Sequence, residues 1–346
     1  MSKADKDNTL QVMRGIAIVL VLVWHSIAQV NRDPVLNGVG QIIICFHMPV
    51  FFVIAGFLFE KGLAKYIKNG RIAFLKKKAK HLLVPYIFWT VLLWAGVNGV
   101  QLVMPSTENK LSLLGFPPMT VIEMLWGILT YENYYTQHLW FLYVLFVFFI
   151  INIFMPKRGK TWIACVLWIV LGFVSVCVNL PNILGRILLW GCFFCFGRII
   201  CDKQSILLRE SGGGYWTVSL FICFSALRVI SYSASGNIII RFAVQLIKYA
   251  EGFLGVCIIY VLAKKLENNA VVKTIGDYSY DIYLMHNPYV VATTSVILNK
   301  VIGINSYITI VTAVTAGIAL PICASRCVIR NIPFLTKVLL GMERKK

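Results

Sequence analysis

Arg14 and His25 lie eleven residues apart in RGIAIVLVLVWHS, a run that is otherwise almost wholly apolar. At about 100° per residue, eleven helical steps return to within about 20° of the same face, so both side chains point the same way. The rise of 1.5 Å per residue separates them by about 16 Å, which predicts Arg14 at a membrane edge and His25 deep in the bilayer. An ionisable side chain at that depth costs about 2.5–3.5 kcal/mol to insert, so the pair is a candidate functional site.

Two structural interpretations of the same residues stay open. Arg14 can be an interfacial anchor that follows the positive-inside rule, and His25 can bond to a neighbouring helix without taking part in chemistry.

Two further histidines are predicted at membrane depth, each two residues before a proline. His47 precedes Pro49 in CFHMPVFFVIAGFLF, and His286 precedes Pro288 in GDYSYDIYLMHNPYV. Proline lacks an N–H and frees the carbonyl four residues earlier, which is tolerated where a cavity or partner helix satisfies it. Gly56 would let another backbone approach closely. The three histidines together indicate a polar cavity, in which a neutral imidazole can take a proton from an attacking hydroxyl. Their spacing is not a zinc pattern, so no metal site is expected.

The elements that must position these side chains are membrane helices. The chain is 59% hydrophobic and only 14% charged, with a mean hydropathy of +0.78, which excludes a soluble globular domain. Continuous apolar runs favour helices over the short alternating strands of a barrel. We therefore predict an all-α bundle of about ten spans in a single domain over residues 1–346, near residues 12–30, 40–59, 82–104, 137–155, 161–179, 183–201, 214–230, 238–262, 275–298 and 305–329.

Basic residues predict the orientation of the bundle. With the N-terminus in the cytoplasm, the inside segments hold 23 of the 33 lysines and arginines, and the outside loops hold only Arg32, Lys110 and Lys300. Both termini, including a short tail at 330–346, are therefore expected in the cytoplasm of a cell-membrane protein. The first helix has no obvious small-residue cleavage site and is expected to be retained.

One predicted inside segment is unusually basic. Residues 60–81, EKGLAKYIKNGRIAFLKKKAKH, form a predicted cytoplasmic loop with eight basic side chains. The loop can bind lipid phosphates, which is the simpler interpretation, or a soluble polyphosphate ligand. The net charge of +19 is otherwise a topology signal and gives no case for nucleic-acid binding.

Several function classes lack their signatures. The ten cysteines fall almost entirely in apolar segments, where they behave as small hydrophobes, and the Cys192/Cys195 pair has no second ligand pair. No Walker loop, GxGxxG, HExxH or GxSxG occurs. ATP-driven pumps, dinucleotide enzymes, zinc proteases and serine hydrolases are therefore not indicated.

Five segments in order resemble one family. They are Arg14 with His25, then FHMPVFFVIAGFLF (46–59), LKKKAKHLLVPYIFW (75–89), HLWFLYVLF (138–146) and YSYDIYLMHNP (278–288). Together they closely resemble the acyltransferase-3 family of integral membrane O-acyltransferases, with the fucose 4-O-acetylase-like branch nearest. The resemblance covers nearly the whole chain. Ala55 departs from it, because many members have serine there.

The resemblance implies a ten-helix bundle that passes an acyl group, commonly acetyl from cytoplasmic acetyl-CoA, to a hydroxyl of a sugar or other acceptor at the outer face. It also implies that Arg14 and His25 match the arginine and histidine of the family's first helix. No cofactor is expected to stay bound, since acetyl-CoA is a donor substrate. The longest outer loop, residues 105–136 with Glu108, Glu123 and Glu132, is the expected place of acceptor contact.

Joining the resemblance to the residues gives a mechanistic hypothesis. His25 acts as general base on the acceptor hydroxyl or carries the acyl group itself, Arg14 orients the donor, and His47 and His286 line the cavity. The expected phosphate contacts are Arg71, Lys76, Lys77 and Lys78, and the side chains expected to stack on a sugar ring are Trp140 and Tyr143. A membrane-interface belt explains these two aromatic residues equally well.

The rival hypothesis is a transporter or flippase for a glycan or lipid-linked intermediate. Such proteins also use broken helices and buried ionisable residues. The two halves of the chain show no convincing internal repeat, and a structural scaffold would leave the three deep histidines unexplained.

Overall fold

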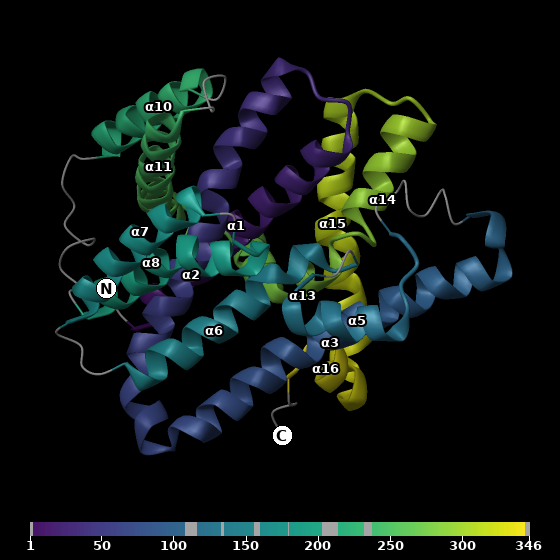
Figure 1. Cartoon of the computed structure of the whole chain (residues 1–346), viewed down its shortest axis with the longest axis horizontal. Coiled ribbons are helices and arrows are strands. Elements are labelled where there is room, and N and C mark those ends of the chain that lie inside the picture. The colour runs from purple at the N-terminus through teal and green to yellow at the C-terminus, as the bar shows by residue number, and fades with distance from the viewer. Residues whose placement is uncertain are drawn as a thin grey trace. The chain divides into compact units, whose positions relative to one another are not determined.

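Every regular element in the described part of the chain is a helix. The computed structural model describes residues 3–107, 116–132, 135–155, 160–178, 180–202, 214–231 and 237–342. Figure 1 shows the helices in chain order: α1 (Lys3–Gln29), α2 (Pro34–Lys68), α3 (Arg71–Val103), α5 (Val121–Thr130), α6 (Trp140–Phe154), α7 (Thr161–Cys177), α8 (Asn182–Asp202), α10 (Gly214–Ser231), α11 (Ile238–Lys265), α12 (Ala270–Asp277), α13 (Ser279–Met285), α14 (Val291–Ser295), a π-helix (Val296–Val301), α15 (Ser306–Cys327) and α16 (Pro333–Leu339).

The helical membrane architecture predicted from composition is confirmed. Among the described residues, seven helices are long and apolar enough to cross a membrane: Asn8–Gln29, Pro34–Lys68, Arg71–Val103, Gln137–Phe154, Asn182–Cys201, Ile238–Lys265 and Ser306–Asn331. Shorter apolar helices at Thr161–Cys177 and Trp216–Arg228 occupy two more of the predicted spans. The protein is therefore a multi-pass membrane protein.

The predicted span at 275–298 is wrong as a single helix. The chain forms α12 and α13, leaves helical geometry after His286, and resumes as α14, which leads into the π-helix. Pro288 explains the break, because it disfavours helical geometry at Asn287 and cannot donate a backbone hydrogen bond. His286 therefore stands at the end of a short helix instead of within a long one.

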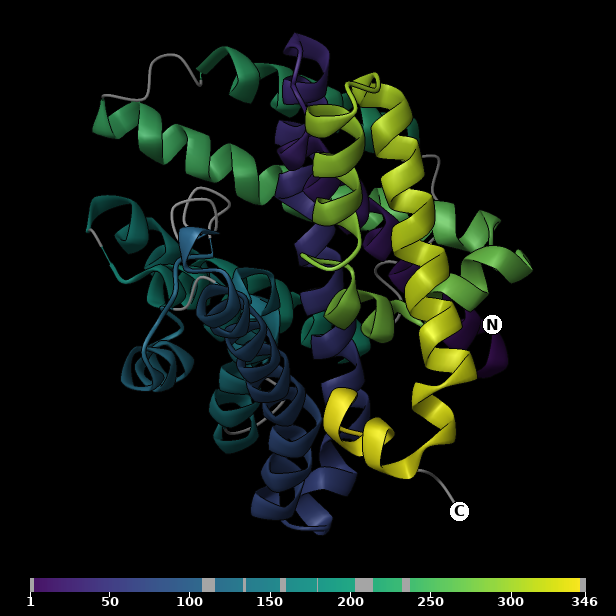
Figure 2. The ribbon, with the colours of Figure 1, turned by 90° about the vertical axis from the view of Figure 1, so that its right-hand side faces the viewer.

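The described chain divides into two compact units. The first comprises Met1–Lys65, Pro156–Pro181 and Leu188–Cys323, and the second comprises Tyr66–Met155, Asn182–Ile187 and Ala324–Lys346. In the first unit α1 packs against α11, α12, α13 and α14, and α10 packs along α11 (Figure 1). Figure 2 shows α14 beside α15, where Gly317 of α15 faces Val291. This unit holds Arg14 and the three histidines that were predicted at membrane depth.

Glycines permit two close helix contacts in the first unit. A Cβ on Gly276 of α12 would lie 2.0 Å from the Gln11 carbonyl oxygen of α1, and a Cβ on Gly56 of α2 would lie 2.0 Å from the Phe194 carbonyl oxygen of α8. Such separations exclude any side chain, so the close approach predicted for Gly56 is confirmed. Small residues at crossings are the usual means by which membrane helices pack, since lipid is as apolar as their side chains.

In the second unit α3 packs against α6, α5 and α16. The Trp89 indole of α3 donates to the Leu339 carbonyl of α16 at 3.2 Å, and the Thr90 and Thr136 hydroxyls lie 2.6 Å apart.

Residues 60–81, predicted as a loop, are mostly helical: α2 continues to Lys68, Gly70 turns the chain with a φ of 95°, and α3 begins at Arg71. The basic residues therefore lie on the end of α2 and the beginning of α3.

Candidate active site

His25 and His286 meet in the interior of the first unit. Their ring centroids are 5.0 Å apart with an interplanar angle of 61°, an edge-to-face arrangement between α1 and the end of α13. His286 is fully enclosed, whereas His25 keeps partial exposure. His47 of α2 is also buried and belongs to the same unit. The three histidines predicted at membrane depth therefore lie in one unit, and two of them are in contact.

Backbone carbonyls fix the protonation pattern of the two buried rings. Nδ1 of His286 lies 2.8 Å from the Tyr283 carbonyl oxygen and 3.2 Å from that of Ile282, and Nδ1 of His47 lies 2.7 Å from the Ile43 carbonyl oxygen. A carbonyl oxygen can only accept, so Nδ1 carries the proton in each ring. In a neutral ring, Nε2 is then left with the lone pair, and each ring presents a proton acceptor at its outer edge.

Hydrogen bonds hold α1 beside the broken segment. The Ser26 and Ser295 hydroxyls lie 3.0 Å apart in the interior, and the Asn31 N–H donates to the Asn299 amide oxygen at 2.9 Å. Arg14 is half-buried, with Nε enclosed by protein, and it shares the uninterrupted helix α1 with His25. These contacts set the position of His25 relative to α14 and the π-helix.

The arrangement suits proton transfer. A neutral imidazole in contact with a second one can bind a hydroxyl and take its proton as the oxygen attacks an electrophile. Within the described residues, no group of three or more His, Cys, Asp or Glu side chains could hold a metal ion.

The predicted phosphate contacts separate into two kinds in the second unit. Arg71, Lys76 and Lys77 are exposed on α3. Lys78 is not, because its Nζ lies 4.6 Å from the Phe149 ring centroid and 5.7 Å from that of Phe74. A cation placed over aromatic faces is already stabilised by them. Lys78 therefore fits a packing role better than a ligand contact.

The two predicted stacking residues already have protein partners in the second unit. The Arg186 guanidinium lies 4.7 Å from the Trp140 ring centroid. The Tyr143 hydroxyl donates to the Leu129 carbonyl at 3.1 Å, and its ring packs against Tyr86 and Tyr131. A sugar would have to replace the arginine to stack on that face of Trp140.

The predicted acceptor loop is described only in part. Glu123 belongs to a capping box at the start of α5, where its carboxylate accepts from the Thr120 N–H at 2.8 Å. Glu132 is exposed, and Glu108 lies outside the described residues. Glu123 therefore has a structural role in ending the loop.

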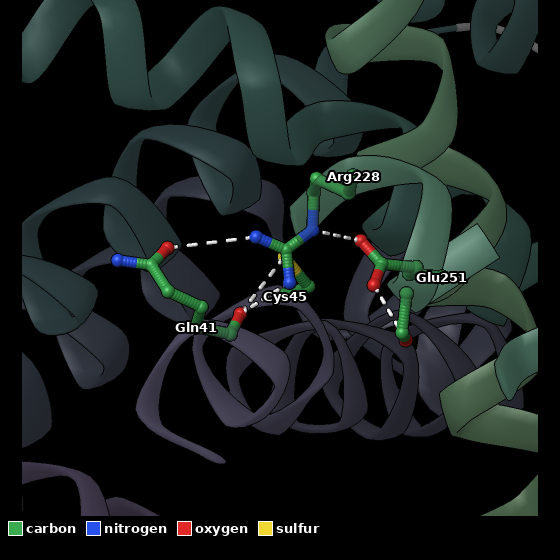
Figure 3. A network of polar contacts seen from close by, with 5 residues as sticks. Gln41, Cys45, Arg228 and Glu251 are labelled. Carbon is green, nitrogen blue, oxygen red and sulfur yellow. Dashed lines mark hydrogen bonds and ion pairs between the residues drawn. The ribbon is translucent and has the colours of Figure 1, made fainter. Parts of the chain in front are cut away.

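Sequence reasoning missed a buried ion pair between α10 and α11. Arg228 Nε donates to Glu251 at 2.6 Å, the Ser225 hydroxyl donates to the other carboxylate oxygen at 2.8 Å, and Arg228 Nη2 donates to the Gln41 carbonyl of α2 at 2.6 Å. Figure 3 shows this network, with Cys45 beside it. Glu251 is 0% exposed and Arg228 2%. The signal that could have found it is one charge of each sign inside neighbouring apolar spans.

A second buried pair joins α2 to α8. Arg198 Nε donates to Glu60 at 2.8 Å, and the guanidinium lies 5.4 Å from the Phe59 ring centroid. Sequence analysis placed Glu60 in a loop, although α2 continues past it. The pair lies close to the Gly56 crossing and reinforces it.

Comparison with known proteins places the chain in a family. The profile of the acyltransferase domain named acyltransferase-3 matches residues 7–326. The chain is 21% identical over 365 aligned positions to nodulation protein NolL of Mesorhizobium japonicum, across 97% of this chain and 91% of that protein. It is 22% identical over 228 positions to nodulation protein NolL of Sinorhizobium fredii, across 64% of this chain and 56% of that protein. No solved structure matches. Because the profile covers nearly all of a helical membrane chain, the protein belongs to the acyltransferase-3 family and is a membrane acyltransferase.

Proposed function

We propose that the protein transfers an acetyl group from cytoplasmic acetyl-CoA to a hydroxyl of a cell-surface or lipid-linked sugar. The observation that carries the proposal is the contact between His25 and His286, two histidines that lie within the family match. Family membership supports acyl transfer, and the resemblance to the fucose 4-O-acetylase-like branch supports a sugar acceptor. The orientation proposed for transfer places both termini in the cytoplasm.

In the proposed reaction His25 serves the acceptor hydroxyl. As the hydroxyl oxygen bonds to the thioester carbonyl carbon, a ring nitrogen of His25 takes the hydroxyl proton. The C–S bond then breaks, and the protonated imidazole gives this proton to the departing CoA thiolate. In the alternative route a ring nitrogen of His25 attacks the thioester carbonyl carbon, and the C–S bond breaks to release the CoA thiolate. The acceptor hydroxyl then attacks the acyl-imidazole, the acyl–nitrogen bond breaks, and the released imidazole takes up the hydroxyl proton. Arg14, on the same face of α1, orients the donor in both routes.

The test uses inside-out membrane vesicles given acetyl-CoA labelled on its acetyl group and a fucosylated oligosaccharide as acceptor. His25→Ala should lower transfer by about 100-fold or more, because a general base contributes about 10²–10⁴-fold. Equal amounts of protein and equal melting temperatures control for insertion. Full transfer by a well-folded His25→Ala protein would refute the role of His25. Absence of both transfer and CoA-dependent thermal stabilisation in the wild type would favour a transporter.

We also propose that Arg71, Lys76 and Lys77 bind the phosphates of the donor. Their exposure at the start of α3 supports this, since an exposed cation can reach a phosphate without leaving another partner. Lys76→Ala with Lys77→Ala should raise the apparent KM for acetyl-CoA by about 3- to 10-fold, which corresponds to a few tenths to 1 kcal/mol per exposed charge contact. The matched control is Arg32→Ala with Lys300→Ala, which removes two other exposed charges. An unchanged KM would leave lipid anchoring as the explanation of the basic segment.

A further inference from the structure

We propose that α5 and α6 together form one broken crossing of the membrane, and that the exposed apolar face of α5 contacts the acyl chains of lipids. The side chains of this face are Val121, Ile122, Leu125, Trp126 and Leu129. Sequence analysis placed all of them in an outer loop. The inference goes beyond the proposed function and does not depend on it, because it concerns how α5 lies in the membrane.

Hydrogen bonds hold α5 along α3. The Trp94 indole of α3 donates to the Met119 carbonyl, just before α5, at 2.7 Å, and the Tyr86 hydroxyl donates to the Ile128 carbonyl, near the end of α5, at 3.3 Å. The two helices are therefore antiparallel, and α5 lies beside the middle of α3 (Figure 1). α3 is one of the candidate spans, and residues 86–94 belong to its apolar part, which follows the lysines of residues 76–80. The part of α3 that crosses the bilayer is thus the part that α5 accompanies.

α6 carries the chain onward along the same helix. The Tyr143 ring packs against that of Tyr86, and the Phe149 ring packs against that of Phe74. α5 and α6 therefore follow α3 in one direction, one after the other. The 10 residues of α5 span only about 15 Å, too short to cross a hydrocarbon core of about 30 Å alone. Followed by α6, α5 becomes the first part of a crossing.

The break between the two helices is suited to membrane depth. The Tyr131 hydroxyl lies 2.9 Å from the Thr136 carbonyl oxygen and 2.8 Å from that of Gln137, and the Thr136 hydroxyl lies 2.6 Å from that of Thr90 on α3. The Leu139 N–H donates to the Thr136 carbonyl at 2.9 Å. Irregular backbone within a membrane needs such protein partners, because lipid offers none.

The composition of the exposed face identifies lipid as its partner. Apart from Glu123, which caps the helix, each exposed side chain of α5 is apolar, and the five are between 52% and 80% exposed. Water rarely meets such a contiguous apolar face, whereas lipid chains cover it as well as protein does. Glu132, the exposed residue after Tyr131, is charged, so its side of the break has to face water.

The first test measures whether water reaches Trp126 in the full-length wild type. Hydroxyl radicals oxidise side chains that water reaches, and mass spectrometry gives the oxidation rate of each residue in proteoliposomes relative to the digested protein. Trp126 is 62% exposed, and the control Met104, at the outer end of α3, is 58% exposed. We expect Trp126 to be protected at least about 10-fold more than Met104, because the hydrocarbon region holds no water. Oxidation of Trp126 at nearly the rate of the digest would place α5 outside the membrane and overturn the proposal.

The second test distinguishes lipid from protein as the cover of α5. Lipids brominated on their acyl chains quench tryptophans that touch them, and the fluorescence lost in Trp126→Phe gives the share of Trp126. We expect brominated lipid to quench most of this share. The matched control is Trp89→Phe, since Trp89 is 7% exposed and its share should be quenched little. Equal melting temperatures control for folding.

A Trp126 share that resists both radicals and bromine would show that protein, such as a second copy of the chain, covers the face, and would overturn the proposal. The radical measurement needs no variant, so it decides the position of α5 even if Trp126→Phe is unstable. Neither test uses acyl transfer. A water-exposed Trp126 would therefore leave the role of His25 standing, and full activity of His25→Ala would leave the position of α5 standing.

Discussion

Glu251→Gln removes the negative charge from the buried pair of Figure 3 while keeping a side-chain oxygen that can accept from Ser225. The change leaves the Arg228 guanidinium, 2% exposed, with only neutral partners in the network, the backbone carbonyl of Gln41 at 2.6 Å and its amide oxygen at 3.5 Å. A charge in that position is buried without compensation. We therefore expect the variant to be much less stable than the loss of one contact would suggest.

The magnitude follows from comparing two cases. Removing one member of a buried ion pair costs about 3–5 kcal/mol, because the other charge stays desolvated. An ordinary hydrogen bond between membrane helices is worth about 0.6 kcal/mol on average and at most about 1.7. Replacing both charges, by Arg228→Met with Glu251→Met, loses only such bonds and should cost about 1–2 kcal/mol. The double variant should therefore be more stable than Glu251→Gln alone.

The assay is unfolding in mixed micelles of increasing SDS content, followed by the fluorescence of the nine tryptophans. Wild type, Glu251→Gln, Arg228→Met and the double variant give a free energy of unfolding each. The matched control is Gln41→Leu, which keeps the backbone carbonyl that binds Arg228 at 2.6 Å and loses only the amide contact at 3.5 Å. It should change the free energy of unfolding by less than about 0.5 kcal/mol.

Two results would refute this reasoning. If Glu251→Gln lowers the free energy of unfolding by less than about 1 kcal/mol, the buried Arg228 guanidinium is stable without the carboxylate. The charge of Glu251 then does not compensate that of Arg228 as argued. If the double variant is as unstable as the sum of the single ones, the two charges act independently and no coupling exists between them.

Two further predictions concern α2. Gly56→Ala should lower the free energy of unfolding by about 1–3 kcal/mol, because the added Cβ would lie 2.0 Å from the Phe194 carbonyl oxygen. The control Gly38→Ala adds a Cβ that meets nothing within 4 Å, so it should be neutral or stabilising. Equal unfolding curves of the two variants in SDS would contradict the close crossing at Gly56. Before α2, hydrogen bonds from the Leu36 N–H and then the Tyr307 hydroxyl lower the pKa of Asp33, so its contribution to stability is present above about pH 4 and is lost as the pH falls through the lowered pKa. The melting temperature of Asp33→Asn should therefore lie below that of the wild type at pH 7 and converge with it toward pH 3; a constant gap would show that Asp33 does not titrate as argued.

The helical membrane class and the position of most spans could be read from the sequence, because hydropathy and length act locally. The candidate pair Arg14 and His25 followed from helical periodicity within α1, which the structure leaves uninterrupted. The close contact at Gly56 also followed, since a glycine in an apolar helix serves mainly to admit a neighbour. Each of these properties depends on a residue and its near neighbours in the chain.

Other properties depend on how helices are rotated and shifted against one another. Lys76, Lys77 and Lys78 are equivalent by composition, yet only Lys78 meets aromatic rings, because successive residues on α3 point in different directions. The partners of Arg228 and Arg198 were equally hidden, since an isolated charge in an apolar span does not name the helix that carries its counter-ion.

From composition and hydropathy the sequence predicts a helical membrane protein, and helical periodicity puts Arg14 and His25 on one face of its first span. The contact between His25 and His286, 261 positions later in the chain, depends on the tertiary structure, because it arises where the chain interrupts a span that hydropathy predicted as one helix. The physical reason is that apolar surface specifies insertion but not pairing: lipid satisfies it as well as protein does, so the polar groups and small residues at the crossings select which helices meet.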